Sequence, residues 1–150
     1  MLRLIGGIFL GGLTIAVVDF AALSAVYWVM GADWALESGK YYPTLQWDIF
    51  HVIISTLVAI VAGSVARWLG RTSKTTIGLI LLVLTFGVVK ILTAKVSATS
   101  RSGTPDTFDA MVSMQASVLV IFTLPVLRAV GVFIGGFVQR ISTPANASAT

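Results

Sequence analysis

Four apolar stretches of this 150-residue chain are long enough to cross a lipid bilayer. They run over residues 4–30, 49–69, 76–94 and 110–138. A helix of about 20 apolar residues spans a hydrocarbon core of about 30 Å, whereas a membrane-spanning strand needs only about 10. A helix also satisfies all of its backbone hydrogen bonds internally. We therefore predict an all-α, multi-pass membrane protein with four transmembrane helices in an antiparallel bundle.

The composition excludes a soluble domain. Hydrophobic residues make up 57% of the chain and charged residues only 11%, with a mean hydropathy of +0.96. Residues 1–141 are expected to form the transmembrane domain, and the polar residues 142–150 a flexible tail. The first apolar run is too long for a cleaved signal peptide and is expected to be retained. With no cysteine and one histidine, His51, the chain offers no set of metal ligands, and we expect no metal, no cofactor and no enzyme activity.

The charged residues are distributed unevenly between alternate connections. Basic residues lie at both ends and in the second connection, whereas acidic residues lie in the first and third connections: Arg3, Arg67, Arg71, Lys74 and Arg140 against Asp33, Glu37, Asp48, Asp106 and Asp109. Cytoplasmic connections carry excess Lys and Arg. The pattern predicts that both termini are cytoplasmic, in an inner membrane, and that the net charge of +4 reflects topology rather than nucleic-acid binding.

Aromatic residues gather around the first connection. Tyr and Trp prefer the interfacial layer of a membrane, so we interpret five of them as an outer aromatic belt: Trp28, Trp34, Tyr41, Tyr42 and Trp47. A short interfacial helix is predicted around residues 33–38, ended by Gly39 and Pro43. A lid or docking element is the alternative interpretation. Thr107, which precedes the fourth span, is a candidate cap for the last helix.

Small residues recur at four-residue spacing, which lets helices approach closely. The predicted packing pairs are Gly7/Gly11, Ala59/Gly63 and Gly131/Gly135. All lie in the predicted cytoplasmic halves, so we expect a bundle that is narrow there and a cavity that opens outward. Residues 62–67 and 135–140 share a small–small–x–Val–x–Arg pattern, which indicates either two parallel helical hairpins or chance similarity.

Three ionisable residues interrupt the spans: Asp19, Lys90 and Arg128. At about 1.5 Å per residue, Asp19 lies roughly 22 Å above Leu4 and Lys90 about 20 Å above Ile77. An Asp19–Lys90 ion pair at this matched depth would offset the cost of burying both charges. Arg128 lies deeper and is the second candidate partner. Asp19 could serve a structural pair, proton- or ion-coupled transport, or a contact with another subunit.

The first span carries the segment Gly12-Leu13-Thr14-Ile15-Ala16-Val17-Val18-Asp19. Its glycine, threonine and acid, together with the four short spans and the basic helix ends, resemble the GtrA-like small four-helix membrane proteins. The resemblance implies a role in moving polyprenyl-phosphate-linked sugars across the inner membrane, and Asp19 is the site residue that it carries. The chain also resembles other small four-span bacterial membrane proteins.

Two functions are compatible with these features. The first is a non-catalytic accessory subunit that assembles with other membrane helices or with a second copy. It predicts a buried Asp19–Lys90 pair without a cavity, and a glycine-rich face left for a partner. The alternative is a small transporter or lipid-linked-sugar flippase, which predicts a polar cavity lined by Asp19, Lys90 and Arg128.

Overall fold

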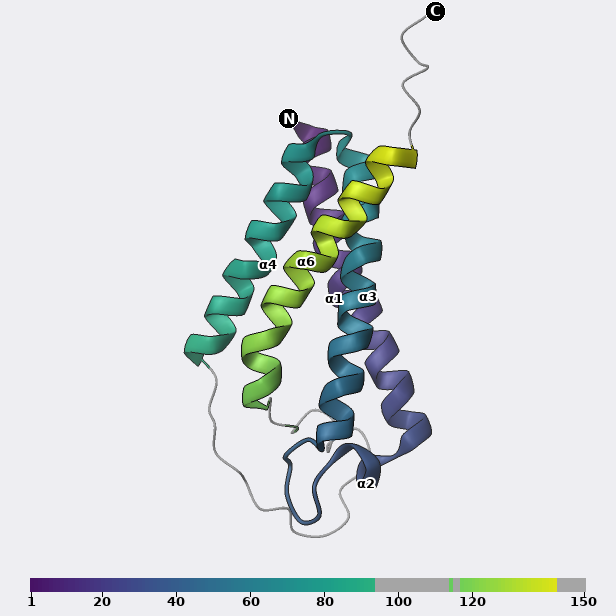
Figure 1. Cartoon of the computed structure of the whole chain (residues 1–150), viewed down its shortest axis with the longest axis vertical. Helices are drawn as coiled ribbons and strands as arrows, with labels where there is room; N and C mark the ends of the chain where they lie inside the picture. Colours follow the sequence, from purple (N-terminus) through teal and green to yellow (C-terminus); the bar gives the residue numbers. More distant parts are fainter. Residues whose placement is uncertain (94–113, 115–116, 143–150) are drawn as a thin grey trace, which may run out of the picture.

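The computed structural model describes residues 1–93, 114 and 117–142. Four long helices in this part are apolar and long enough to cross a membrane (Figure 1). They are α1 (Leu2–Met30), α3 (Leu45–Gly70), α4 (Ser73–Thr93) and α6 (Val118–Ser142), and a short helix, α2 (Ala32–Ala35), follows α1. The prediction of an all-helical chain with four helices of membrane-spanning length is therefore confirmed for the described residues.

The start of the fourth helix differs from the prediction. Met114 and Ser117 are not helical, and α6 begins at Val118 rather than at residue 110. Ser117 caps α6, because its hydroxyl oxygen accepts a hydrogen bond from the Val120 N–H at 3.2 Å. Hydropathy marks apolar residues but does not mark where a helix is capped, which explains the error. Thr107 lies outside the described residues.

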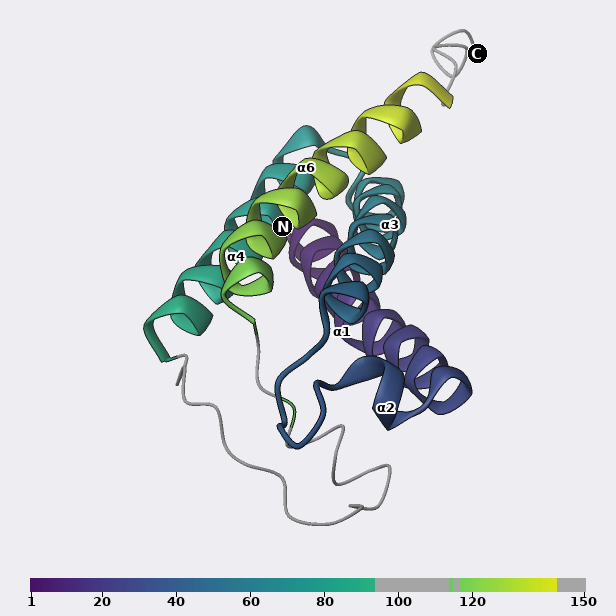
Figure 2. The same ribbon diagram turned by 60° about the horizontal axis from the view of Figure 1, so that its bottom comes forward.

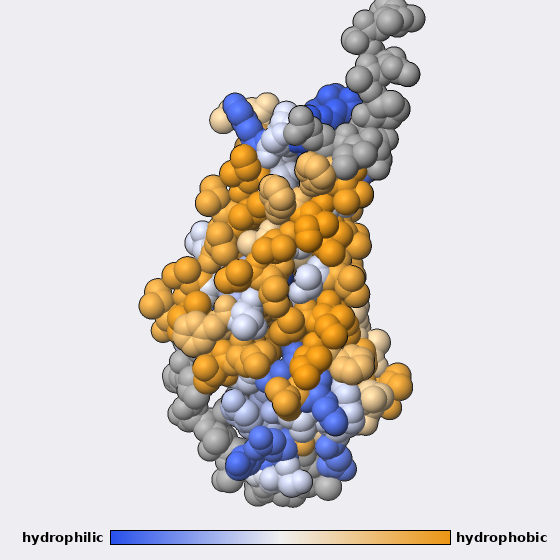
Figure 3. Space-filling model, viewed as in Figure 1, coloured by the Kyte–Doolittle hydropathy of each residue, from blue (hydrophilic) through white to orange (hydrophobic). Residues whose placement is uncertain are grey.

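The ends of the helices define two ends of the molecule. The start of α1, the turn between α3 and α4 and the last part of α6 lie together, and we call this the turn end (Figure 1). The segment around α2 lies at the opposite end, the loop end, as a second view also shows (Figure 2). An apolar surface separates two more polar ends (Figure 3). This distribution is the one that a bilayer requires.

Helices α3 and α6 run in the same direction and pack closely through glycines (Figure 1). A Cβ on Gly63 would meet backbone atoms of Val132, and one on Gly135 would meet the carbonyl oxygen of Ile60. Ser64 Oγ also donates to the Gly135 carbonyl oxygen at 3.1 Å. The two segments with similar sequence patterns thus lie against each other.

Helix α1 packs against α3 and α4 near the turn end. A Cβ on Gly7 would meet Thr75 and Ala66, and a Cβ on Gly11 would meet Leu79 and Ala66. The structure buries all six predicted packing residues: Gly7, Gly11, Ala59, Gly63, Gly131 and Gly135. The glycines among them contact other helices of the same chain.

The loop end is held by a cluster of aromatic side chains. The Trp47 ring contacts Tyr27 edge-on, with 5.7 Å between centroids, and Trp34 at 6.2 Å. Tyr27 and Trp47 are buried with Leu36, whereas Trp28 is 78% exposed and Tyr41 and Tyr42 are half-buried. Trp47 of the predicted belt therefore lies in a packed core with Tyr27, which the prediction did not include, and Trp28 remains at the surface.

The predicted interfacial helix is present but shorter, since α2 ends at Ala35. Leu36 is extended and pairs with Pro43 in an isolated bridge. Thr44 joins this loop to α3: its hydroxyl donates to the Trp34 carbonyl oxygen at 2.8 Å and accepts from the Trp47 N–H at 3.2 Å. One side chain thus caps α3 and fastens the loop.

Thr44→Ala is expected to lower the free energy of unfolding by about 1–2 kcal/mol, because a helix cap and a loop hydrogen bond are lost together. Unfolding in detergent micelles titrated with SDS measures this. Thr14→Ala is the matched control, since the Thr14 hydroxyl bonds only to Leu10 of its own helix. Equal stability of the two variants would contradict the stabilising role of the Thr44 side chain.

Candidate functional site

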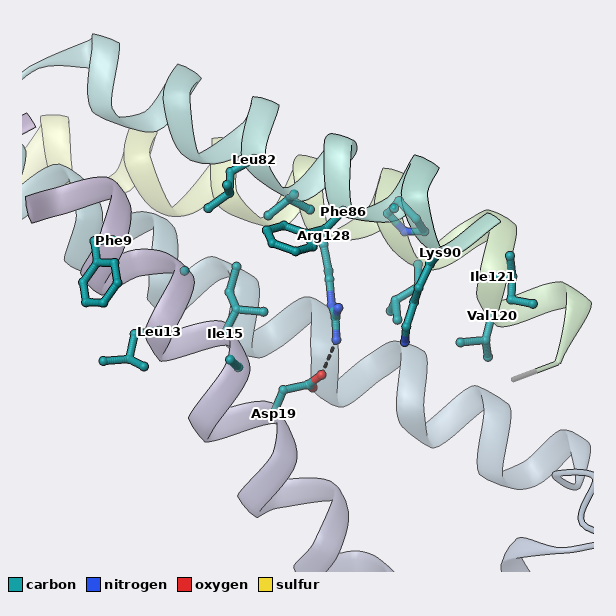
Figure 4. Close-up of a pocket in the computed structure, with 16 residues that line it drawn as sticks. Phe9, Leu13, Ile15, Asp19, Leu82, Phe86, Lys90, Val120, Ile121 and Arg128 are labelled. Carbon is teal, nitrogen blue, oxygen red and sulfur yellow. Dashed lines mark hydrogen bonds and ion pairs between the residues drawn. The ribbon is translucent and has the colours of Figure 1, made fainter. Parts of the chain in front are cut away.

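A buried ion pair joins α1 to α6. Arg128 Nη2 bonds to Asp19 Oδ2 as an ion pair and hydrogen bond (Figure 4). The Asp19 side chain is 10% exposed and that of Arg128 is 20% exposed. In such surroundings an unpaired charge is costly, so each group compensates the other. The only acid in the first apolar run is therefore paired within the chain.

Ser55 of α3 completes the cluster. Its hydroxyl donates to Asp19 Oδ1 at 2.5 Å, and its oxygen accepts from Arg128 Nη2 at 3.1 Å. Ser55 is fully buried. Three helices are thus tied together by one carboxylate, one hydroxyl and one guanidinium. Ser55 was not among the predicted site residues. A serine within an apolar helix, at the same depth as Asp19, is the signal in the sequence that would have identified it.

The partner of Asp19 differs from the first prediction, which was Lys90. Among the described residues Asp19 pairs with Arg128, the second candidate, and Lys90 forms no ion pair. Lys90 lies on the exposed part of α4, and its side chain points into the same space as that of Arg128 (Figure 4). The depth estimate used only the rise along each helix. It took no account of the separation of α1 from α4 at this level.

An apolar groove lies between α1 and α4, with α6 as its floor. Its volume is about 580 Å³, and its lining includes Phe9, Leu13, Leu82, Phe86 and Leu124. Near the turn end the two helices are held together by the contacts of Gly7 and Gly11. Farther along, α4 packs instead on α6, where Gly87 lies against Pro125. Asp19, Lys90 and Arg128 also line the groove, which continues past them to Val120 and Ile121 of α6.

A second cavity, the vestibule, continues from the charged residues toward the loop end. It has a volume of about 410 Å³ and includes more polar side chains: Ser24, Asp48, His51 and Ser117, with Trp47. Five residues line both cavities: Ala16, Asp19, Lys90, Val120 and Arg128. The groove and the vestibule therefore meet at the charge cluster. Together they form an amphipathic site with an apolar compartment, a charged centre and a polar compartment.

His51 and Asp48 both line the vestibule, since residues three apart lie on one face of a helix. The described residues contain no group of three or more His, Cys, Asp and Glu side chains that could hold a metal ion. The chemistry that the site offers is hydrogen bonding, charge compensation and apolar burial. These are the means of binding an amphipathic molecule.

Comparison of the chain with models of protein families, with curated proteins and with solved structures finds no match.

Proposed function

We propose that this chain is a small multi-pass membrane transporter for an amphipathic lipid that carries a phosphate group. The lipid tail occupies the apolar groove between α1 and α4, and the head group lies at the charge cluster and in the vestibule. Under this proposal the four helices cross an inner membrane in alternating directions, with both termini in the cytoplasm. The charge pattern of the connections supports this orientation.

The observation that carries the proposal is the junction of the two cavities at Asp19, Lys90 and Arg128. Asp19 and Arg128 neutralise each other. Lys90 then remains as a cation with no ion-pair partner among the described residues, at the boundary between the apolar and polar compartments. A phosphate group is complementary to such a cation. An acyl or isoprenoid chain is complementary to the groove.

The same features favour transport over an accessory role. An accessory subunit was expected to have no cavity and to present a glycine-rich face to a partner. The glycines of the predicted packing pairs instead contact neighbouring helices of this chain, and the charged residues line two cavities. Assembly with other subunits or with a second copy remains compatible with the lipid-facing surface, but it does not account for the cavities.

Lys90→Gln is expected to lower the rate of lipid transport at subsaturating lipid by roughly tenfold or more, since a charge-assisted hydrogen bond contributes about 1.5–3 kcal/mol. The measurement is translocation of fluorescent phospholipids in liposomes reconstituted with the purified protein. Lys74→Gln is the matched control, because Lys74 is an exposed lysine of α4 at the turn end and lines neither cavity.

Both variants should purify as folded protein, because Lys90 is exposed and makes no ion pair among the described residues. Wild-type liposomes that translocate lipid no faster than protein-free liposomes would contradict the proposed function. Equal loss of transport in the two lysine variants would contradict the proposal that Lys90 binds the phosphate group of the lipid.

A further inference from the structure

The vestibule contains buried polar atoms that no side chain in the described part of the chain satisfies. Asp48 is 5% exposed, and its Oδ1 atom has no hydrogen-bond partner among the described residues. Ser117 hydrogen-bonds the carboxylate group but leaves this oxygen free. Ser24 Oγ is likewise buried without a partner there. Both residues line the vestibule. An unsatisfied buried carboxylate oxygen is costly, so a donor that enters the vestibule would be bound favourably.

The charges of the two cavities are also separated along the membrane normal. Once Asp19 and Arg128 have paired, Lys90 remains as the basic side chain of the two cavities and Asp48 as their carboxylate. Asp48 precedes Ser55 by seven residues in α3, which places it about 10 Å nearer the loop end than the ion pair. Lys90 lines both cavities and Asp48 lines only the vestibule. Along the bundle from the turn end, most of the apolar groove therefore comes first, then the cation and then the anion.

We infer that the head group bound here is zwitterionic and carries a primary ammonium, as in an ethanolamine phospholipid. This inference rests on the proposed function and names its substrate class. The phosphate lies at Lys90, the ammonium donates hydrogen bonds to Asp48 Oδ1 and Ser24 Oγ, and the chains occupy the groove. The order of ammonium, phosphate and acyl chain in such a lipid is the order of anion, cation and groove in the protein.

A primary ammonium suits this site better than a trimethylammonium. The free atoms of Asp48 and Ser24 need N–H donors, which a choline group lacks. A choline group is usually bound over open aromatic faces. Two aromatic residues line the vestibule. Trp47 is 4% exposed and packs edge-on against Tyr27 and Trp34, so it offers no open face, whereas Phe20 is 63% exposed but is a single ring rather than an aromatic cage. An anionic glycerol head would satisfy Lys90 but bring no cation to Asp48.

The test is a competition for the purified wild-type protein in detergent, read by native mass spectrometry. Equimolar phosphatidylethanolamine, phosphatidylcholine and phosphatidylglycerol with identical chains are supplied after delipidation. We expect wild type to retain the ethanolamine lipid roughly tenfold over the other two, which corresponds to one charge-assisted hydrogen bond. Asp48→Asn should bring this ratio close to one while total lipid retention persists. Lys90→Gln should lower retention of all three lipids.

Glu37→Gln is the control at the loop end, because Glu37 pairs with Lys40 at 3.3 Å on the surface and lines neither cavity. It should leave the ratio unchanged. Equal retention of the three lipids by wild type, with loss in Lys90→Gln, would overturn the ethanolamine assignment and leave the proposed function standing. Failure of wild type to retain any phospholipid would overturn both. The comparison among lipids on wild type does not depend on the folding of any variant.

Discussion

Asp19→Asn is expected to lower the free energy of unfolding by about 3–5 kcal/mol, the usual cost of removing one partner of a buried ion pair. The guanidinium of Arg128 would stay in the bilayer core without a counter-ion, and Ser55 would lose a charged acceptor. SDS-titrated unfolding in mixed micelles, followed by tryptophan fluorescence, measures the loss.

The double variant Asp19→Asn/Arg128→Met is the informative control, because it removes both charges. Its stability should recover a large part of the loss, since the remaining side chains are neutral and similar in volume. The stability of the double variant is compared with those of Asp19→Asn and Arg128→Met alone. A loss in the double variant equal to the sum of the two single losses would show that the two side chains do not interact, contrary to the structure. Lys90→Gln should leave stability nearly unchanged, which separates the structural pair from the proposed ligand contact.

Gly135→Leu is expected to cost about 3 kcal/mol or more, because the new side chain would be directed at the backbone of α3. Its Cβ would meet the Ile60 carbonyl oxygen and lie 2.9 Å from the Ser64 nitrogen. Backbone atoms cannot move aside as a flexible side chain does, so α3 and α6 must separate. The measurement is thermal unfolding in detergent, together with the monodisperse fraction on size exclusion.

Gly6→Leu is the matched control for this change. A Cβ on Gly6 meets no atom within 4 Å, and leucine has the higher helix propensity. This variant should be as stable as wild type or slightly more stable. A similar loss in both variants would indicate a general intolerance of bulk in these helices rather than a specific α3–α6 contact.

The long helices could be predicted from the sequence because hydropathy over about 20 residues leaves few structural choices in a bilayer. The ends of the helices were less predictable, since Thr44 and Ser117 set them through single hydrogen bonds. The residues of the charge cluster were identified in part. Asp19, Lys90 and Arg128 were recognised by the cost of burying charge.

The pairing within the cluster was not determined by the sequence. Rise along a helix gives depth, but the choice between Lys90 and Arg128 depends on which helices are neighbours at that depth. Glycine contacts settle this, because they bring α3 against α6 and hold α1 to α4 only near the turn end. The hydrogen bonds of Ser55 and the free oxygen of Asp48 likewise emerge only when the helices are placed in space.

The close contacts of Gly7 and Gly11 near the turn end have a consequence for the direction of lipid entry. Helices α1 and α4 are in contact at that end, and the charged residues of the groove, Asp19, Lys90 and Arg128, all lie beyond these contacts. Under the proposed function, a lipid from the leaflet at the loop end enters with its head group already at Lys90. A lipid from the opposite leaflet would bring its phosphate to tightly packed glycines. This conformation therefore serves one leaflet, and release into the other requires α1 and α4 to separate at the turn end.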